Sequence, residues 1–266
     1  MTVLATADRS ASGVSYAVLG EGGPVTVFAH GLGGSAAETR PLASRVGGTR
    51  VLLTFRGHGD SADLPPSGWD YDVLADDLLA VADQVGATRA VGLSLGGGAL
   101  LRALSRDPLR FDRLAFVMPA GIDAARVDGA ALRLRSLADI VDSGDAEAVT
   151  AQLMSELPID IQERRGVAVL VGRRAAQLVS RPAPRPRGND RPLHDRAQLA
   201  AFTAPTLVIG QQEDPLHQLD VARELAAGLP DAQLLALGEG GVFWTDARTA
   251  QDALAAHLDP PAGDTA

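Results

Sequence analysis

Short apolar runs recur along the chain, and the stretches between them are long enough to hold a helix. The runs are rich in Val, Leu, Ile and Phe and do not alternate with polar residues, which is typical of strands buried on both faces. They occupy residues 25–30, 50–55, 89–94, 113–118, 205–210 and 232–237. Buried strands joined by helical crossovers predict an α/β fold, with a mostly parallel sheet flanked by helices on both sides.

The clearest helix signal lies in residues 72–85, where Leu74, Leu78, Val81 and Val85 recur at spacings of three and four and the aspartates fall elsewhere. Glycines follow the third apolar run, and the pattern then continues as a helix until an Asp-Pro pair stops it. Besides residues 72–85, helices are predicted over residues 96–106, 221–229 and 247–258.

One interval breaks the alternation of strand and helix. Residues 121–200 are helical in pattern and rich in arginine, and the repeated prolines of residues 180–192 exclude regular structure there. We expect this interval to form a lid over one end of the sheet. The core would then comprise residues 1–120 and 201–258, followed by a disordered tail at 259–266.

Composition excludes several kinds of chemistry. The 266 residues carry a net charge of −9, which disfavours nucleic acid and anionic membranes as partners and favours a small molecule. There is no cysteine, and all 24 basic residues are arginine, so thiolate, Schiff-base and phosphate-loop lysine chemistry is absent. We expect no metal and no cofactor. The first residues lack a signal-peptide pattern and no apolar run is long enough to span a membrane, so we expect a cytoplasmic protein.

The strongest chemical motif follows the third apolar run. Gly92-Leu93-Ser94-Leu95-Gly96 matches G-x-S-x-G between a predicted strand and a predicted helix. Such a turn is tight enough to require glycines on both flanks, and it exposes the serine hydroxyl at the helix N-terminus. Backbone N–H groups at that point can stabilise an oxyanion. The motif therefore predicts Ser94 as a nucleophile.

Two further loops extend the pattern. Residues 30–35 (HGLGGS) follow the first apolar run, and residues 55–61 (FRGHGDS) follow the second. In this order the three motifs resemble the α/β-hydrolase superfamily, in particular its esterase, epoxide-hydrolase and carbon-carbon-hydrolase branch, over residues 15–258. The resemblance implies an oxyanion hole formed by the backbone N–H groups of Leu32 and Leu95. It also implies that the two loop histidines, His30 and His58, support turns.

The same resemblance implies an acid after the fifth apolar run, where Asp214 stands, with Asp123 as the alternative. It further implies a catalytic histidine after the last run, but Gly241 occupies that position. The triad is thus predicted to be incomplete. The alternatives for a replacement base are His217, His194 and Glu239, whereas His257 is expected to face away from the site.

The arginines of the predicted lid stand out in an acidic protein: Arg164, Arg165, Arg173, Arg174, Arg181, Arg185 and Arg187. They form either a solvated helix face or a guanidinium site for a substrate carboxylate or phenolate at the pocket mouth.

These features predict an enzyme of small-molecule metabolism that acts on a carbonyl compound, by hydrolysis of an ester, thioester or lactone through Ser94. Because the usual histidine is missing, a cyclase, lyase or carbon-carbon bond-forming enzyme is one alternative. A non-catalytic small-molecule-binding protein is the other.

Overall fold

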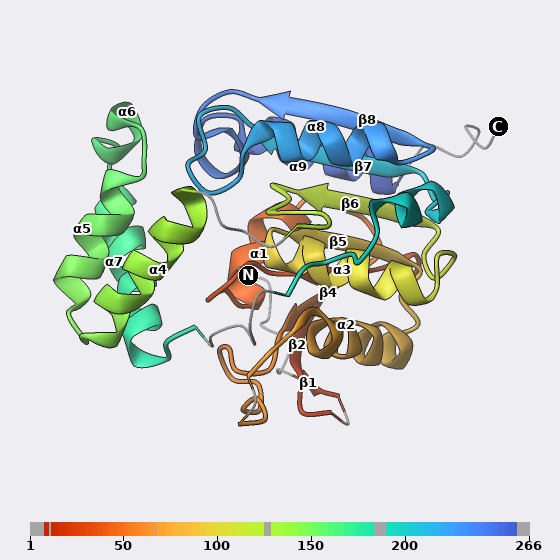
Figure 1. Cartoon of the computed structure of the whole chain (residues 1–266), viewed down its shortest axis with the longest axis horizontal. Coiled ribbons are helices and arrows are strands. Elements are labelled where there is room, and N and C mark those ends of the chain that lie inside the picture. The colour runs from red at the N-terminus through yellow and green to blue at the C-terminus, as the bar shows by residue number, and fades with distance from the viewer. Residues whose placement is uncertain (1–7, 11, 67, 125–128, 184–189, 260–266) are drawn as a thin grey trace.

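A single eight-stranded sheet forms the centre of the molecule (Figure 1). The computed structural model describes residues 8–10, 12–66, 68–124, 129–183 and 190–259. All six predicted strands are present, as β3 (Val25–Ala29), β4 (Thr49–Thr54), β5 (Arg89–Leu93), β6 (Arg113–Val117), β7 (Thr206–Gln211) and β8 (Ala232–Leu237). The prediction of an α/β-hydrolase fold with a mostly parallel sheet is confirmed.

The sequence pattern missed two strands at one end of the sheet, β1 (Asp8–Arg9) and β2 (Ser15–Leu19). The sheet order is β1-β2-β4-β3-β5-β6-β7-β8, in which β1 pairs antiparallel with β2, β2 pairs antiparallel with β4 and the remaining pairs are parallel. β1 and β2 lie at or near the edge of the sheet and are short. They lack the continuous apolar run by which the central strands were predicted.

The expectation that all six runs are buried on both faces is wrong for β8. This strand is the other edge of the sheet, and most of its residues are exposed or half-buried, with Leu234 39% exposed. An edge strand has a neighbour on one side only, so an apolar composition by itself does not bury it.

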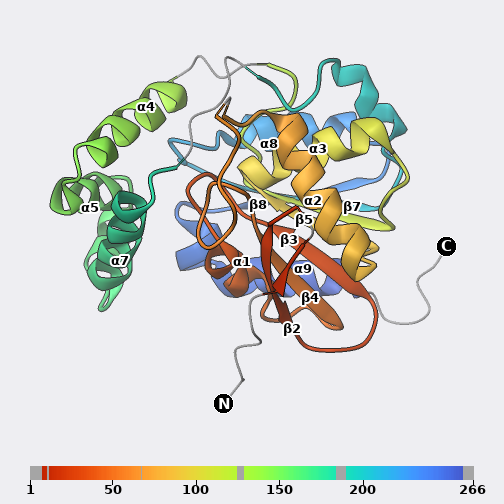
Figure 2. The same cartoon turned by 90° about the horizontal axis from the view of Figure 1, so that it is seen from below.

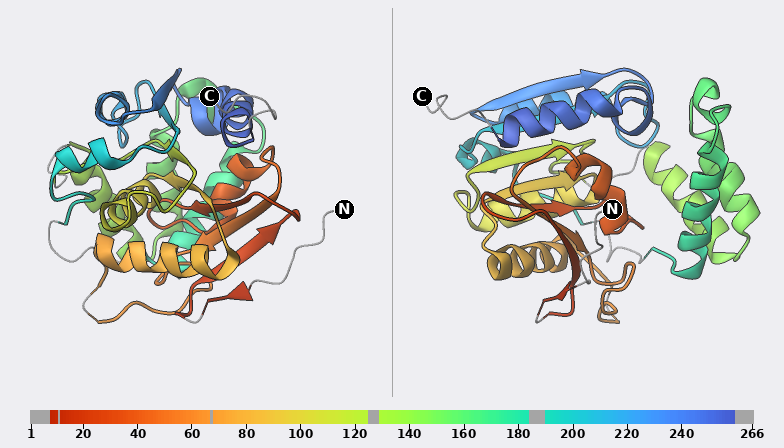
Figure 3. Two further views of the ribbon diagram at one scale, coloured as in Figure 1. Left: turned by 90° about the vertical axis from the view of Figure 1, so that its right-hand side faces the viewer. Right: turned by 180° about the vertical axis from the view of Figure 1, so that it is seen from behind.

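Helices cover both faces of the sheet (Figures 1 and 3). On one face, α2 (Tyr71–Val85), α3 (Leu95–Arg106) and α8 (Leu219–Gly228) pack over the larger core cluster, which includes Leu74, Leu100 and Leu225. On the other face, α1 (Ala36–Ala43) and α9 (Ala247–Leu258) bury Leu42, Leu254 and Leu258. The four predicted helices agree with the observed ones to within two residues at each end; α1 was not predicted.

In the described part of the interval between β6 and β7, four α-helices lie beyond the carboxyl ends of the strands, apart from the sheet and its covering helices (Figures 1 and 2). They are α4 (Gly129–Asp142), α5 (Ala146–Ser155), α6 (Ile159–Gln162) and α7 (Val167–Ser180), and we call them the inserted helices. They have apolar clusters of their own, one built on Val141, Val149, Ala175 and Leu178. A short 3₁₀ helix, η1 (Arg196–Ala201), follows before β7.

Asp259, expected to begin a disordered tail, is held by the core. Its carboxylate lies 2.7 Å from the Arg89 guanidinium and accepts a hydrogen bond from the Gly47 amide. Residues 260–266 lie outside the described residues. Within the described part of the chain, no helix is both long and apolar enough to cross a bilayer.

Candidate active site

Ser94 sits at the bend between β5 and α3, in a backbone conformation that L-residues rarely adopt (φ 49°, ψ −109°). Both flanking glycines are required by space. A Cβ built on Gly92 would lie 2.6 Å from the Gly97 Cα, and one on Gly96 would lie 2.4 Å from the Ala29 carbonyl oxygen. The strained turn is stabilised by its surroundings and holds the Ser94 hydroxyl where β5 ends.

One histidine contacts Ser94. The His217 Nε2 atom lies 2.8 Å from Ser94 Oγ, and its Nδ1 atom lies 3.1 Å from Asp214 Oδ2. The carboxylate beside Nδ1 favours a proton on that nitrogen, which leaves Nε2 free to accept the proton of the Ser94 hydroxyl. The three side chains therefore form one continuous hydrogen-bonded chain, with Asp214 and His217 both supplied by the loop after β7.

Asp214 is fixed by four donors. Its Oδ1 atom accepts hydrogen bonds from the backbone amides of Leu216 and His217, at 2.7 and 2.9 Å. Its Oδ2 atom accepts from Gln211 Nε2 at 2.9 Å as well as from His217. Burial disfavours the charged carboxylate, but the hydrogen bonds from the His217 ring and from the Leu216 and His217 amides outweigh it and hold the pKa of Asp214 below its usual value. Asp214 is thus ionised at neutral pH.

Gly241, where the family resemblance implies a histidine, has no space for a side chain. A Cβ there would lie 2.6 Å from the Leu237 Cβ and 3.3 Å from Asp246 Oδ2. The adjacent Val242 amide donates to Gln211 Oε1 at 3.1 Å, so Gln211 joins this segment to Asp214. Sequence reasoning missed Gln211; its only signal was a polar residue at the end of a buried strand.

Leu32 and Leu95 are both near Ser94. Leu32 lines the same cavity as Ser94, and a Cβ built on the preceding Gly31 would lie 3.5 Å from the Ser94 Cβ. Leu95 is the first residue of α3, and its amide lies at the helix N-terminus. Within the described residues neither amide has a hydrogen-bond acceptor. The geometry is compatible with both N–H groups serving an anionic oxygen beside Ser94.

His30 and His58 are buried and contact loop backbone. His30 donates from Nδ1 to the Gly31 carbonyl at 2.6 Å and accepts at Nε2 from the Phe55 amide at 3.0 Å. His58 Nδ1 lies 3.1 Å from the Arg56 carbonyl. Burial lowers the pKa of His30 well below its usual value and that of His58 to about 4. Both rings are therefore neutral supports of the two loops.

The other candidate groups lie elsewhere. Asp123 is 2.7 Å from the Arg196 guanidinium, in an ion pair on the surface. His257 Nε2 lies 2.9 Å from the Leu114 carbonyl, facing β6. His194 is exposed and does not line the cavity that contains Ser94 or the adjoining cavity that reaches Trp244. Glu239 is exposed and lines the cavity that reaches Trp244.

The arginines divide into three groups. Arg164 pairs with Asp160 on α6, and Arg165 and Arg173 are exposed. Arg174 and Arg181 contact loops of the core. Arg185 and Arg187 lie outside the described residues.

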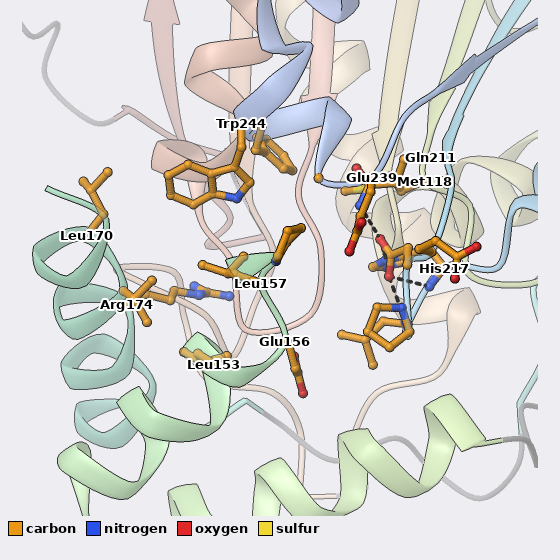
Figure 4. A pocket seen from close by; sticks show the side chains of 18 residues that line it. Met118, Leu153, Glu156, Leu157, Leu170, Arg174, Gln211, His217, Glu239 and Trp244 are labelled. Atoms are coloured by element: carbon orange, nitrogen blue, oxygen red, sulfur yellow. Dashed lines mark hydrogen bonds and ion pairs between the residues drawn. The ribbon is translucent and has the colours of Figure 1, made fainter. Parts of the chain in front are cut away.

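His217 lines two adjoining cavities. One, of about 220 Å³, is lined by Ser94 and mostly by apolar side chains, which come from both the core and the inserted helices; we call it the Ser94 cavity. The other, of about 310 Å³, reaches Trp244 and is the Trp244 cavity (Figure 4). Figure 4 shows the Arg174 side chain extending into this space from the side opposite His217. The shared lining residues are Met118, Leu153, Glu156, Arg174, Leu216, His217 and Phe243.

No metal centre is evident in the described ranges, where no three His, Cys, Asp or Glu side chains are grouped to hold an ion. The chemistry available at the site is that of a hydroxyl, an imidazole, a carboxylate and two backbone amides.

The fold and this group of residues define a protein of hydrolase type. Residues 26–257 match the model of the alpha/beta hydrolase family, and the chain belongs to that family. YisY of Bacillus subtilis (strain 168), an AB hydrolase superfamily protein, is 26% identical over 236 residues, which cover 84% of this chain and 86% of YisY. RutD of Caulobacter segnis, a carbamate hydrolase by name, is 29% identical over 262 residues, 93% of this chain and 97% of RutD.

Solved structures share the fold. The esterase EaEST from Exiguobacterium antarcticum superposes with a TM-score of 0.69 at 20% identity, over 94% of this chain and 97% of the esterase. The serine hydrolase CCSP0084 from a Cycloclasticus bacterium has a TM-score of 0.75 at 18% identity, over 97% of this chain and 99% of that one. At these identities the likeness concerns the fold.

Proposed function

We propose that this protein is a serine hydrolase that cleaves an ester, thioester or lactone, with Ser94 as nucleophile, His217 as general base and Asp214 as the residue that orients the imidazole. The observation that carries the proposal is the pair of contacts made by one ring: His217 lies 2.8 Å from Ser94 and 3.1 Å from Asp214. These contacts favour hydrolysis over the alternatives that rest on a missing base.

The proposed reaction follows from the geometry. Ser94 Oγ attacks the substrate carbonyl carbon while its proton moves to His217 Nε2. The amides of Leu32 and Leu95 stabilise the oxyanion that forms. The imidazolium then protonates the leaving alcohol or thiol, and an acyl-enzyme remains on Ser94. A water molecule activated by His217 releases the acid and restores the serine.

The cavities indicate the substrate class. The Ser94 cavity is mostly apolar and about 220 Å³ in volume, which suits a small acyl group. Three acidic residues, Glu38, Asp142 and Glu156, line it against one arginine, Arg174, and this balance disfavours an anionic substrate. We therefore propose an uncharged carbonyl substrate, with the inserted helices acting as the lid. The similar proteins include one named as a carbamate hydrolase and one named as an esterase, and carbamates and esters are both carbonyl compounds.

A fluorophosphonate probe tests the proposal, because it labels a serine only when a base activates the hydroxyl. Mass spectrometry of the digested protein should locate the label on Ser94, and Ser94→Ala should remove it. The protein should also release p-nitrophenol from p-nitrophenyl butyrate with a burst. If the folded protein takes up no label and shows no burst, Ser94 is not activated and the proposed function fails.

A further inference from the structure

Two arginines of the inserted segment reach the core, Arg174 within α7 and Arg181 directly after its last residue. Each donates to backbone carbonyls of a core loop. Arg181 donates to the carbonyls of Gly59 and Ser61, the latter at 2.8 Å, and pairs with Asp63 at 3.1 Å. The two contacts have similar chemistry but reach different loops.

Arg174 reaches the loop beside Ser94. Its Nη1 donates to the Gly33 carbonyl and its Nη2 to the Leu32 carbonyl at 3.3 Å. The guanidinium also lies 3.8 Å from the carboxylate of Glu38, whose Oε2 accepts from the Gly31 amide at 2.8 Å. In the described part of the chain, Arg174 supplies the donors for both the Leu32 and Gly33 carbonyls.

The orientation of the Leu32 amide depends on this loop. That amide shares a peptide group with the Gly31 carbonyl, which accepts from His30 Nδ1 at 2.6 Å and from the Gly34 amide at 2.9 Å. Because a peptide group is planar and trans, fixing the carbonyl turns the Leu32 N–H the opposite way. The core thus holds the peptide group before Leu32, and the inserted helix holds the one after it.

We propose that Arg174 is a positioning residue that links seating of the inserted helices to formation of the oxyanion hole. With α7 in place, the guanidinium fixes the Leu32 and Gly33 carbonyls, so the loop that carries the Leu32 N–H keeps its position beside Ser94. With α7 displaced, the loop gains freedom at Gly33, whose φ is already +67°. The inference rests on the proposed function, since it concerns the same oxyanion.

This role differs from a guanidinium site for a substrate carboxylate. Each terminal nitrogen of Arg174 already donates to a loop carbonyl, and Nη2 lies 3.8 Å from the Glu38 carboxylate. A substrate carboxylate could use only the remaining N–H groups, and it would meet the negative charge of Glu38 at the same place.

Arg174→Gln and Arg181→Gln form a matched pair for the test, because each removes one arginine contact between the inserted segment and the core. Steady-state hydrolysis of p-nitrophenyl butyrate and the rate of fluorophosphonate labelling would be measured on both folded variants. Loss of one oxyanion donor costs about 10²–10³ in kcat, so a misplaced donor should cost about 10- to 100-fold. Arg174→Gln should lower kcat and labelling by that factor with KM within about threefold. Arg181→Gln should keep kcat within about threefold, and Arg174→Lys should recover part of the loss.

Three results would overturn the inference. Equal losses of kcat in the two glutamine variants would mean that Arg174 acts only by holding the lid. A kcat of wild-type size in Arg174→Gln would mean that the loop orders itself. A loss confined to KM, and only with an anionic ester such as the p-nitrophenyl monoester of succinate, would make Arg174 a substrate ligand. Labelling of wild-type Ser94 keeps these results distinct from failure of the proposed function.

Discussion

Replacing His217 removes the proposed general base and leaves the rest of the site in place. The side chain is largely buried, at 15% exposure, and its ring joins Ser94 to Asp214. His217→Ala therefore leaves the serine with an unassisted hydroxyl beside intact amide donors. Because His217 comes from the loop after β7, the substitution does not disturb the strand-to-helix turn that holds Ser94.

The expected loss is large. Removing the histidine of a serine triad costs about 10⁶ in kcat, and about 10³–10⁴ over the uncatalysed reaction survives through the oxyanion donors and binding. At 1.36 kcal/mol for each factor of ten, about 8 kcal/mol of transition-state stabilisation depends on this imidazole. Since substrate binding does not use the Nε2–Oγ contact, KM should change much less than kcat.

The assay is a single-turnover acylation of Ser94 by p-nitrophenyl butyrate, followed by release of p-nitrophenol. His194→Ala is the matched control, because that histidine is exposed and lines neither cavity. A rate for His217→Ala within tenfold of the wild type would refute the reasoning. If Glu239→Gln abolished acylation while His217→Ala did not, the base would be Glu239 at the rim of the Trp244 cavity.

Three further predictions follow from the same structure. Asp214→Asn should lower kcat by about 10⁴, measured in the same assay, because the His217 ring loses the partner that fixes its proton on Nδ1; a loss under tenfold would contradict the role. Gly241→Ala should destabilise the fold by about 1–3 kcal/mol in thermal melts, because its Cβ would lie 2.6 Å from that of Leu237. Gly238→Ala, where the nearest atom is 3.6 Å away, should cost less, and equal costs would refute the argument. Burial holds the pKa of His58 at about 4 instead of 6.5. Unfolding frees this ring to bind a proton below pH 6.5, so His58 should contribute about 3 kcal/mol to the fall in the free energy of unfolding between pH 6.5 and 4, with the buried His30 adding to it. Urea titrations across that range would measure the fall, and His58→Gln should make it shallower.

The sequence alone determined the layers of this protein. Strands buried between helices must be apolar throughout, so β3 to β7 were visible as runs, and the amphipathic spacing of α2 marked a surface helix. The turn at Ser94 was also predictable, because side chains at the two flanking glycine positions would clash with the backbone of such a tight turn. The family resemblance, and not a local steric rule, pointed to the Asp214 carboxylate after the fifth apolar run.

Tertiary structure alone decided which base meets Ser94. His217 and Ser94 are 123 positions apart in the chain, and their contact depends on how the loop after β7 folds around Asp214. No local pattern encodes that distance. The family resemblance implied a histidine after β8, where Gly241 stands, but the imidazole beside Ser94 comes from the loop before β8. The same holds for Arg174, whose partners, the Leu32 and Gly33 carbonyls, lie in the core loop between β3 and α1. Spacing along a chain fixes which face of an element a side chain occupies, but only packing fixes which distant group that face meets.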